Sequence, residues 1–509
     1  MEKLVYDNSK QVKTKVDKLR KAFGTHKTKD LDYRIKQLNL LKAAVTKYTP
    51  QIEEANKKDL GQSKFLSFFA TTSHFFLEVD HMISHLKEWA APRSVDTPVA
   101  FAPASSYIVA EPLGVVLVFG AWNFNVSLSL IPMATAIAAG NVVLLKPSEM
   151  ASNSALVIEK ICSELDSDLV QVCQGAQETC EALLLNRFDL IFLTGSPMKG
   201  KIVAKAAAEF LTPCILELGG QNPCIVDKNA NITNAALNLC SGRFFGCGQV
   251  CLSPEYVFVE ESMKDALVEE LKKTVEHFYS GKPKESEDFA RIINTFHAER
   301  LSKLCTNHGG KLICGGDFDI KEKYVAPTIV EFKNLDELAK SPLQKDEIFG
   351  PILSVVPYKD LDDCIDYING KEKPLAMYYY GSNNSNLERI VTNTSSGAIG
   401  CNDTFIHYFN SALPFGGVGS SGTSSYHGKW GFDNLSHLKP VMNRSQFYLK
   451  LRYPPYKPNE GVLNLVLNNI SYTQYGALKF MMWFVIFVLL FVYRNCIMTC
   501  GKNILNKYM

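Results

Sequence analysis

Between Pro112 and Gly220, short apolar runs alternate with segments that have the composition of helices. The first run, GVVLVFG at 114–120, is rich in β-branched residues and carries no charge. Such a run is typical of a parallel strand that is buried on both faces. Strands that alternate with helices predict a doubly wound α/β sheet, with ligand sites at the carboxyl ends of the strands. Further runs of this kind lie at 141–146, 169–172 and 189–194.

Helical and α/β segments flank this region. Residues 1–92 read mostly as helix, because apolar residues such as Leu38, Leu41 and Val45 recur at helical spacing. We interpret this part as a packing layer without chemistry. A second α/β unit begins after Gly220, and a chain of 509 residues is too long for a single core. The net charge of +2 gives no reason to expect a nucleic-acid partner.

The fourteen cysteines are scattered along the chain and do not form a short disulfide framework. No charged-then-apolar segment opens the sequence, so we expect no signal peptide. Reduced thiols in a protein that faces the cytosol are the expectation that follows.

The stretch 475–493 is apolar except for Lys479 and, as a helix, is long enough to cross roughly 30 Å of hydrocarbon. A buried core helix is the alternative interpretation. The loose segment 451–474 before it and the short tail 494–509 after it favour a membrane anchor. The bulk of the protein would then stay on the cytosolic side. The endoplasmic reticulum is the default membrane, with peroxisomes and mitochondria left open.

Polar residues stand where the predicted strands end. Asn123 follows the first strand and could donate to an oxygen that develops negative charge, although Asn at such a point also suits a simple turn. Lys146 ends the second strand, where it could bond ribose hydroxyls. Glu217 lies between apolar residues, and burial would raise its pKa towards neutrality and make it a usable general base. A solvated glutamate at a strand end is the alternative.

The segment Gly195–Ile202 almost fits the phosphate-binding pattern GxxxxGK[ST]. Ile202 replaces the hydroxyl residue that would hold Mg²⁺, which disfavours a nucleoside triphosphatase. A glycine turn that opens a helix can still present backbone N–H groups to a pyrophosphate. A glycine turn without a ligand is the alternative.

Cys247 and Cys251 stand between glycines, one helical turn apart if the segment is helical. A thiolate here would be a nucleophile, and Cys251 is our candidate. A zinc site built from Cys240, Cys247 and Cys251 fits no common ligand spacing and has no histidine nearby, so we expect no metal. Further along, His407 and His427 are interpreted as structural hydrogen-bonding residues.

Taken together, these features resemble the aldehyde dehydrogenase superfamily, near its class 3 or fatty aldehyde dehydrogenase branch. The resemblance implies NAD-dependent oxidation, with NADP possible, of medium- to long-chain aldehydes to carboxylic acids, in a homodimer. Its motifs keep the family's order over about residues 110–440: GAWNFN, AIAAGNVVLLKPSE, FLTGSPMKGKIV, TPCILELGGQNPCIVD, GCGQVCLSPEYV, EIFGPIL and LPFGGVGSSGTSSYHGKWGFDNLSH.

The resemblance also implies a role for each matched residue. Cys251 would attack the aldehyde as thiolate, Asn123 and the Cys251 N–H would hold the oxyanion, and Glu217 would activate the water that opens the thioester. Trp122 and Phe124 would line the substrate pocket. The residues implied to contact the cofactor are Lys146, Glu149, Gly195, Ser196, Gly200, Leu218, Gly219, Glu347 and Phe349.

The implied fold is aldehyde dehydrogenase-like. N-terminal helices and a doubly wound cofactor domain would occupy 1–220, with a bridging strand near 98–112. An α/β catalytic domain would occupy 221–405. A return segment at 406–450 would complete the cofactor domain and a small bridging, oligomerisation sheet.

Two departures and two alternatives stay open. Asn125 stands where this branch usually has proline, which leaves the shape of that turn open. Cys247 is the other candidate nucleophile and could form a reversible disulfide under oxidation. An acyl-CoA reductase and a catalytically idle membrane scaffold are the competing functions. The presence of Cys251, Glu217 and Asn123 argues against the idle scaffold.

Overall fold

The computed structural model describes residues 3–98, 101, 103–446, 453–455, 461, 483–486 and 493. The chain forms two compact units. The first is built from Met1–Ala90 and Ala110–His437, and the second from Ala91–Val109 and Leu438–Met509. All of the predicted site residues belong to the first unit.

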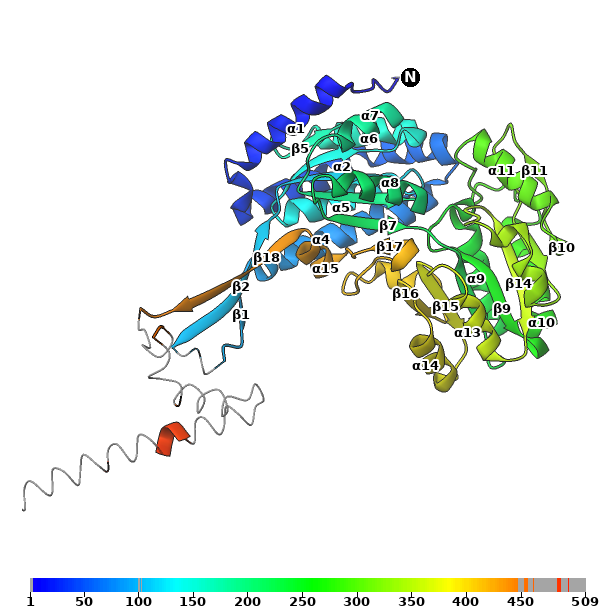
Figure 1. Ribbon diagram of the computed structural model, residues 1–509. Helices are drawn as coiled ribbons and strands as arrows, with labels where there is room; N and C mark the ends of the chain where they lie inside the picture. Colours follow the sequence, from blue (N-terminus) through cyan, green and yellow to red (C-terminus); the bar gives the residue numbers. More distant parts are fainter. Residues whose placement is uncertain are drawn as a thin grey trace, which may run out of the picture. The chain divides into compact units, whose positions relative to one another are not determined.

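A six-stranded sheet in the order β17-β7-β6-β3-β4-β5 forms one half of the first unit (Figure 1). Its strands are parallel except β17, which pairs antiparallel with β7. The apolar runs are buried, and each fully buried Val, Leu or Ile side chain stabilises the fold by roughly 1.5–3 kcal/mol. The strands are β3 (Val115–Phe119), β4 (Val142–Lys146), β5 (Val170–Val172), β6 (Leu190–Gly195), β7 (Cys214–Leu218) and β17 (Gly422–Thr423).

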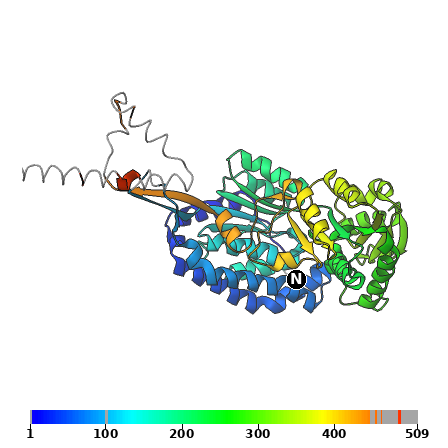
Figure 2. The same cartoon turned by 90° about the horizontal axis from the view of Figure 1, so that it is seen from below.

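Helices pack on both faces of this sheet (Figures 1 and 2). The crossovers α5 and α6 lie on one face, where α2 packs against both of them. The strand order reverses after β5, so right-handed crossovers place α7 and α8 on the other face. The helices are α1 (Ser9–Phe23), α2 (Leu31–Leu60), α3 (Lys64–Ser67), the π-helix η2 (Phe68–Ser73), α4 (His74–Ala90), α5 (Ser127–Ala138), α6 (Ser152–Cys162), α7 (Gln177–Leu184) and α8 (Pro197–Ala208).

A seven-stranded sheet in the order β10-β13-β14-β9-β8-β15-β16 forms the other half. One hydrophobic core runs through both halves. The strands are β8 (Asn222–Val226), β9 (Pro254–Glu260), β10 (Lys311–Cys314), β13 (Thr328–Glu331), β14 (Ile352–Tyr358), β15 (Ala376–Tyr380) and β16 (Ala398–Cys401). The principal helices of this half are α9 (Ile232–Phe244), α10 (Lys264–Tyr279), α11 (Thr295–Thr306), α13 (Leu361–Asn369) and α14 (Asn384–Asn393). Helix α15 (Gly428–Asn434) packs instead against α4 and α5, beside the six-stranded sheet.

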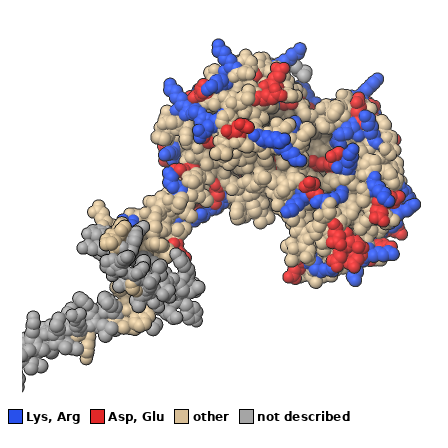
Figure 3. All heavy atoms as spheres, in the orientation of Figure 1, with Lys and Arg blue, Asp and Glu red and all other residues tan. Residues whose placement is uncertain are grey.

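Charged side chains are mixed on the surface of the described chain. Basic and acidic groups are interspersed on the face drawn in Figure 3, in keeping with the net charge of +2.

The second unit contains a three-stranded sheet in the order β1-β2-β18. Its strands are β1 (Arg93–Val95), β2 (Ala104–Pro112) and β18 (Ser436–Arg444). The C-terminal segment of the chain thus supplies β17 to the six-stranded sheet and β18 to this one.

No helix within the described ranges has the length and apolar character needed to cross a membrane. The predicted anchor at 475–493 lies outside the described residues except for 483–486 and 493. The predicted linker at 451–474 lies outside them except for 453–455 and 461, and the tail at 494–509 lies outside them altogether.

Candidate active site

Several of the predicted site residues lie at one edge of the six-stranded sheet. Lys146, the last residue of β4, pairs with Phe119 at the end of β3. Glu217 on β7 pairs with Thr194 on β6. Asn123 lies in the turn between β3 and α5. The edge formed by the carboxyl ends of parallel strands is where doubly wound sheets bind their ligands.

Glu217 is 1% exposed. Burial raises its pKa to about 7, although polar contacts with Cys251 and Thr194 lower it in part. Neither contact has the geometry of a full hydrogen bond, and no other described residue supplies one to the carboxylate. The predicted rise in this pKa is therefore confirmed. A carboxyl group in this state can accept and return a proton near neutral pH.

Cys251 is partly buried, and its thiol lies beside Glu217. Burial raises the pKa of Cys251 well above its usual value, and the negative charges of Glu217 and Glu347 raise it further. The thiol is therefore protonated at neutral pH, and its attack on a carbonyl requires a base. Glu217 is within reach and titrates near neutrality.

The segment before Cys251 is not the helical turn that the sequence suggested. Helix α9 ends at Phe244, and both Gly246 and Cys247 adopt left-handed backbone angles, with φ of 57° and 59°. Gly248 also has a positive φ, of 70°, and a Cβ there would overlap the backbone of Gly350. Only glycine combines this conformation with so close an approach. The loop is thus shaped by backbone packing.

Hydrogen bonds from distant residues fix the nucleophile loop. Asn123 Nδ2 donates to the Gln249 carbonyl at 3.0 Å. Asn222 Nδ2 donates to the Cys251 carbonyl at 2.7 Å, and the Tyr378 hydroxyl donates to the Leu252 carbonyl at 2.7 Å. Asn222 and Tyr378 were not predicted as site residues. Asn222 lies in the motif TPCILELGGQNPCIVD but was given no role there, and Tyr378 lies outside the quoted motifs.

Cys247 has different surroundings. Its thiol is buried and interacts with the Val325 carbonyl at 3.9 Å. Burial raises its pKa strongly, with Arg291 and Arg243 opposing the rise. Among the described residues, no carboxylate acts on the Cys247 thiol as Glu217 acts on Cys251.

A buried ion pair holds the segment that carries Glu347 and Phe349. Arg243 lies 3.6 Å from the Glu255 carboxylate and donates to the Gly350 carbonyl. Glu255 accepts from the backbone N–H of Ile348 at 2.7 Å. Sequence reasoning missed this pair: Glu255 lies in the motif GCGQVCLSPEYV but was given no role there, and Arg243 lies outside the quoted motifs.

Glu347 itself packs against the glycine pair after β7. A Cβ at Gly219 would overlap its carboxylate, and the Gly220 backbone N–H hydrogen-bonds to it. Burial, followed by the charge of Glu255, raises the pKa of Glu347 well above its usual value. Glu347 is thus brought to the same site as Glu217 and Cys251.

The sheet edge also offers groups that fit a dinucleotide. Lys146 Nζ lies 2.6 Å from the Glu149 carboxylate. Burial alone would raise the pKa of Glu149, but the charge and hydrogen bond of Lys146 outweigh it and the pKa is lowered. Lys146 ends β4 and Glu149 follows three residues later, where a cofactor ribose would lie.

Helix α8 starts directly after β6, and Ser196 caps it by accepting from the Lys199 N–H at 3.5 Å. A Cβ at Gly200 would meet Leu218 Cδ1 at 2.8 Å, so glycine lets this helix pack closely on β7. The first turn of such a helix presents N–H groups and a positive dipole end to a pyrophosphate. Gly195, Ser196, Gly200 and Leu218 thus share one edge of the sheet.

Trp122 and Phe124, the two residues predicted to line the substrate pocket, pack against different neighbours. Trp122 packs edge-to-face on Phe349, with ring centroids 5.3 Å apart, and tilts against His297. Phe124 stacks on Phe245 at 6.1 Å. Asn125, the residue at which the sequence departs from the expected proline, is buried. Its Oδ1 accepts from the Val126 N–H at 2.8 Å, so a hydrogen bond between neighbouring residues holds this turn.

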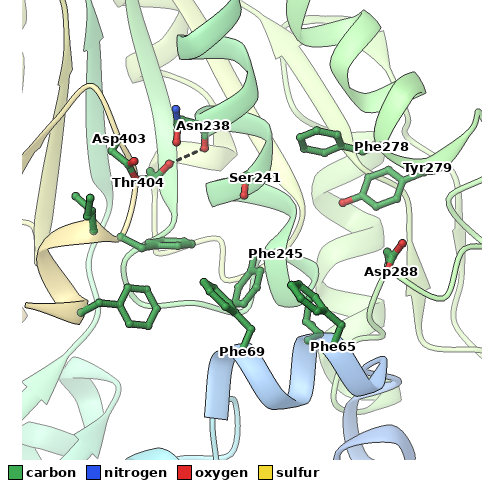
Figure 4. Close-up of a pocket in the computed structure, with 14 residues that line it drawn as sticks. Phe65, Phe69, Asn238, Ser241, Phe245, Phe278, Tyr279, Asp288, Asp403 and Thr404 are labelled. Carbon is green, nitrogen blue, oxygen red and sulfur yellow. Dashed lines mark hydrogen bonds between the residues drawn. The ribbon is translucent and has the colours of Figure 1, made fainter. Parts of the chain in front are cut away.

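Phe245 opens onto an apolar pocket of about 520 Å³ (Figure 4). Phe69 of η2 packs on Phe245 at 6.3 Å and on Phe409 at 5.6 Å. Ligand pockets in proteins commonly measure roughly 300–1,000 Å³. Sequence reasoning missed this pocket, since its phenylalanines come from four separate segments: Phe65, Phe69, Phe245, Phe278, Phe405 and Phe409.

Comparisons with known proteins match these features. Residues 2–441 match the aldehyde dehydrogenase family. The chain is 41% identical over 457 residues to aldehyde dehydrogenase family 3 comG of Dictyostelium discoideum, which covers 89% of this chain and 96% of that protein. It is 40% identical over 446 residues to a dimeric NADP-preferring aldehyde dehydrogenase of Rattus norvegicus, covering 86% and 97%. The substrate-bound structure of Staphylococcus aureus AldH has a TM-score of 0.86 at 36% identity, over 90% of this chain and 99% of that one.

Proposed function

The chain belongs to the aldehyde dehydrogenase family and is an NAD(P)-dependent oxidoreductase that acts on aldehydes, and we propose that its substrates are medium- to long-chain fatty aldehydes. The products would be the corresponding carboxylic acids. The observation that carries this proposal is the phenylalanine-lined pocket beside the loop of Cys251. A hydrocarbon chain that leaves water for such a pocket gains about 0.8 kcal/mol for each buried CH₂ group.

The proposed chemistry begins with the Cys251 thiol. Glu217 takes its proton, and the sulfur attacks the aldehyde carbonyl to form a thiohemiacetal. Asn123 Nδ2 has two hydrogens and uses one on the Gln249 carbonyl, so the other is free for the developing oxyanion. The Cys251 backbone N–H is the second proposed donor. Removing one donor of this kind typically costs roughly 2.7–4 kcal/mol of transition-state stabilisation.

The bound dinucleotide supplies the acceptor for the hydride that leaves the thiohemiacetal carbon. A thioester then remains on Cys251. Glu217 releases the proton from Cys251 to solvent, then removes a proton from the water that attacks this thioester and passes that proton to the departing sulfur, so that the carboxylic acid leaves and the thiol is restored. Lys146, Glu149, the start of α8, Gly219, Glu347 and Phe349 are the residues proposed to hold the cofactor.

The position of Glu149 favours NAD⁺ over NADP⁺ in this proposal. Its carboxylate would accept from a free 2′-hydroxyl and repel a 2′-phosphate. Its partner Lys146 lies 2.6 Å away and lowers the pKa of Glu149, so the carboxylate is ionised at neutral pH. Glu149→Gln should raise the ratio of NADP⁺ to NAD⁺ activity severalfold, and an unchanged ratio would place this side chain away from the ribose.

The apolar stretch at 475–493 supports a membrane anchor with the catalytic unit on the cytosolic face of the endoplasmic reticulum. An anchor would keep the enzyme where apolar aldehydes concentrate. Extraction of cell membranes with alkaline carbonate tests this idea. The full chain should remain in the pellet, and a chain that ends at residue 474 should be released.

A homodimer is the proposed assembly. The word dimeric in the name of the Rattus norvegicus relative supports it. Strand β18 also supports a dimer, because most of its side chains are exposed in the three-stranded sheet of the second unit. Light scattering on the detergent-solubilised chain should give twice the protomer mass of 56.7 kDa.

A series of saturated aldehydes from two to sixteen carbons tests the substrate class. Efficiency, measured as kcat/KM for NAD⁺ reduction, should rise with chain length, and Cys251→Ser should abolish it. Phe409→Ser should lower kcat/KM for hexadecanal about tenfold and leave short aldehydes unchanged, since lost apolar contacts are worth roughly 1–2 kcal/mol. Phe296, an exposed phenylalanine outside the pocket, provides the control Phe296→Ser. Equal efficiency for all lengths would contradict the proposal.

A further inference from the structure

Three side chains with metal-ligating atoms meet in the interior of the first unit. His74 and Glu78 lie one turn apart on α4, and His427 lies just before α15. Their donor atoms all lie within 4.8 Å of one another. Glu78 Oε1 is 4.0 Å from His74 Nε2 and 3.8 Å from His427 Nδ1. We refer to these three residues as the α4 cluster.

Both imidazoles of the α4 cluster lack hydrogen bonds. His74 is 1% exposed and His427 is 0% exposed. Within the described chain, none of their four ring nitrogens has a hydrogen-bond partner. A buried polar group without a hydrogen-bond partner lowers the stability of the fold by roughly 1–3 kcal/mol. Four such atoms at one place therefore indicate a binding site for a ligand. The sequence-based interpretation of His427 as a hydrogen-bonding residue is therefore wrong for this structure.

The surroundings of the α4 cluster are shaped and apolar. The Tyr408 ring lies 4.4 Å from His74 and 5.0 Å from His427, and the Phe415 ring stacks on His427 at 5.2 Å. Ser411 Oγ donates to Glu78 Oε1 at 2.6 Å and so orients the carboxylate. An apolar shell with an oriented carboxylate is the usual environment of a protein metal site.

We propose that His74, Glu78 and His427 bind a divalent transition-metal ion, of which Zn²⁺ fits best. Two imidazoles and one carboxylate are the ligand set of three-ligand zinc sites, with the fourth position open. Zinc–ligand bonds of roughly 2.0–2.1 Å place tetrahedral donor atoms roughly 3.3 Å apart. From the observed 3.8 Å and 4.0 Å, the two pairs that involve Glu78 need to close by roughly 0.5–0.7 Å, and the histidine pair, which lies within 4.8 Å, by at most roughly 1.5 Å. The proposal does not depend on the aldehyde substrate, because none of the three residues has a role in the proposed reaction.

The test uses the full-length protein, stripped of metal with a chelator and then titrated with Co²⁺ alone. We expect one equivalent of Co²⁺ per chain, with the visible absorption bands of a tetrahedral site, and displacement by Zn²⁺. X-ray absorption of the Zn²⁺ form should show only nitrogen and oxygen ligands at about 2.0–2.1 Å. Sulfur at about 2.3 Å would mean that cysteines hold the metal and would overturn the proposal.

Variants then locate the site. His74→Phe and His427→Phe keep a ring of similar size and should each weaken Co²⁺ binding at least tenfold. His85 lies on the same helix outside the α4 cluster, so His85→Phe is the matched control and should bind as the wild type does. Binding that survives in both His74→Phe and His427→Phe would overturn the assignment, as would a wild-type protein that binds no Co²⁺. The wild-type titration can refute the proposal without any variant. The experiment therefore remains decisive when a variant fails to fold.

Discussion

The Cys251 thiol and the Glu217 carboxylate lie in contact in a site where each changes the acidity of the other. The charge of Glu217 raises the pKa of Cys251, and contact with Cys251 lowers the pKa of Glu217. Burial is the larger effect on both groups. The thiol is the weaker acid of the two, so Cys251 keeps its proton at rest and Glu217 accepts it as the sulfur attacks the carbonyl.

Hydrolysis of the acyl-enzyme should depend on pH through Glu217. Its pKa is about 7, and only the ionised carboxylate can accept a proton from water. The rate of thioester hydrolysis should rise about tenfold per pH unit below 7 and level off above it. Rapid-quench measurement of a preformed acyl-enzyme between pH 5 and 9 checks this. Glu217→Gln should be slow at every pH, and a variant that kept the same rise would assign the titration elsewhere.

Glu217→Gln should also stabilise the fold at high pH. Burial raises the folded pKa to about 7 from 4.5, so the stability gained by protonation is present below pH 4.5 and is lost as pH rises through 7. The difference of about 2.5 units corresponds to a cost of roughly 3 kcal/mol at pH 8, which the neutral amide avoids. The urea midpoint should rise at pH 8 and stay unchanged at pH 4.

Glu149→Gln is the control for that experiment. Its carboxylate has a lowered pKa and an ion-pair partner in Lys146, so its loss should not stabilise the protein at pH 8. A higher urea midpoint in both variants would show a general effect of surface or net charge.

Arg243→Met should destabilise the protein by roughly 3–5 kcal/mol, because it leaves Glu255 buried without its partner. It should also weaken NAD⁺ binding, since this pair positions the segment of Glu347 and Phe349. Urea unfolding and cofactor titration measure the two effects. Arg389→Met, which breaks an exposed pair with Asp362, should cost no more than about 1 kcal/mol and leave NAD⁺ binding intact.

Gly248→Ala should inactivate the enzyme. Its φ of 70° and its approach to the Gly350 backbone leave no room for a Cβ, so the nucleophile loop must move. Gly281 has the same φ of 70° with nothing within 4 Å of its Cβ position, and Gly281→Ala isolates the cost of the backbone angle, roughly 1–2 kcal/mol. Activity lost equally in both variants would mean that the angle, and not the contact with Gly350, is decisive.

The sequence predicted the parts of the fold that depend on local pattern. The buried runs became β3, β4 and β6 because parallel strands covered on both faces tolerate almost no polar residue. The tyrosines Tyr378–Tyr380 are fully buried in β15 in spite of their polar hydroxyl groups. Burial is possible because the hydroxyls of Tyr378 and Tyr379 reach hydrogen-bond partners.

Features that depend on contacts between distant segments could not be predicted. The close approach of Gly248 to the Gly350 backbone joins two distant segments, which no local pattern encodes. The pocket and the α4 cluster each combine residues from opposite ends of the described chain. The burial of Glu217 could be predicted because its neighbours on the strand are apolar.

The pairing of β17 with β7 has a consequence for the order in which the enzyme is made. Gly422 lies opposite Glu217, so the base acquires its neighbour on that side only after residue 422 has been synthesised. A nascent chain holds Cys251 and Glu217 long before then, and chains emerge from the ribosome with the N-terminus first. Cys251 and Glu217 are therefore translated well before β17, the strand that pairs with β7 at the edge of the six-stranded sheet. A product truncated before residue 422 would carry both residues in an active site that lacks this strand.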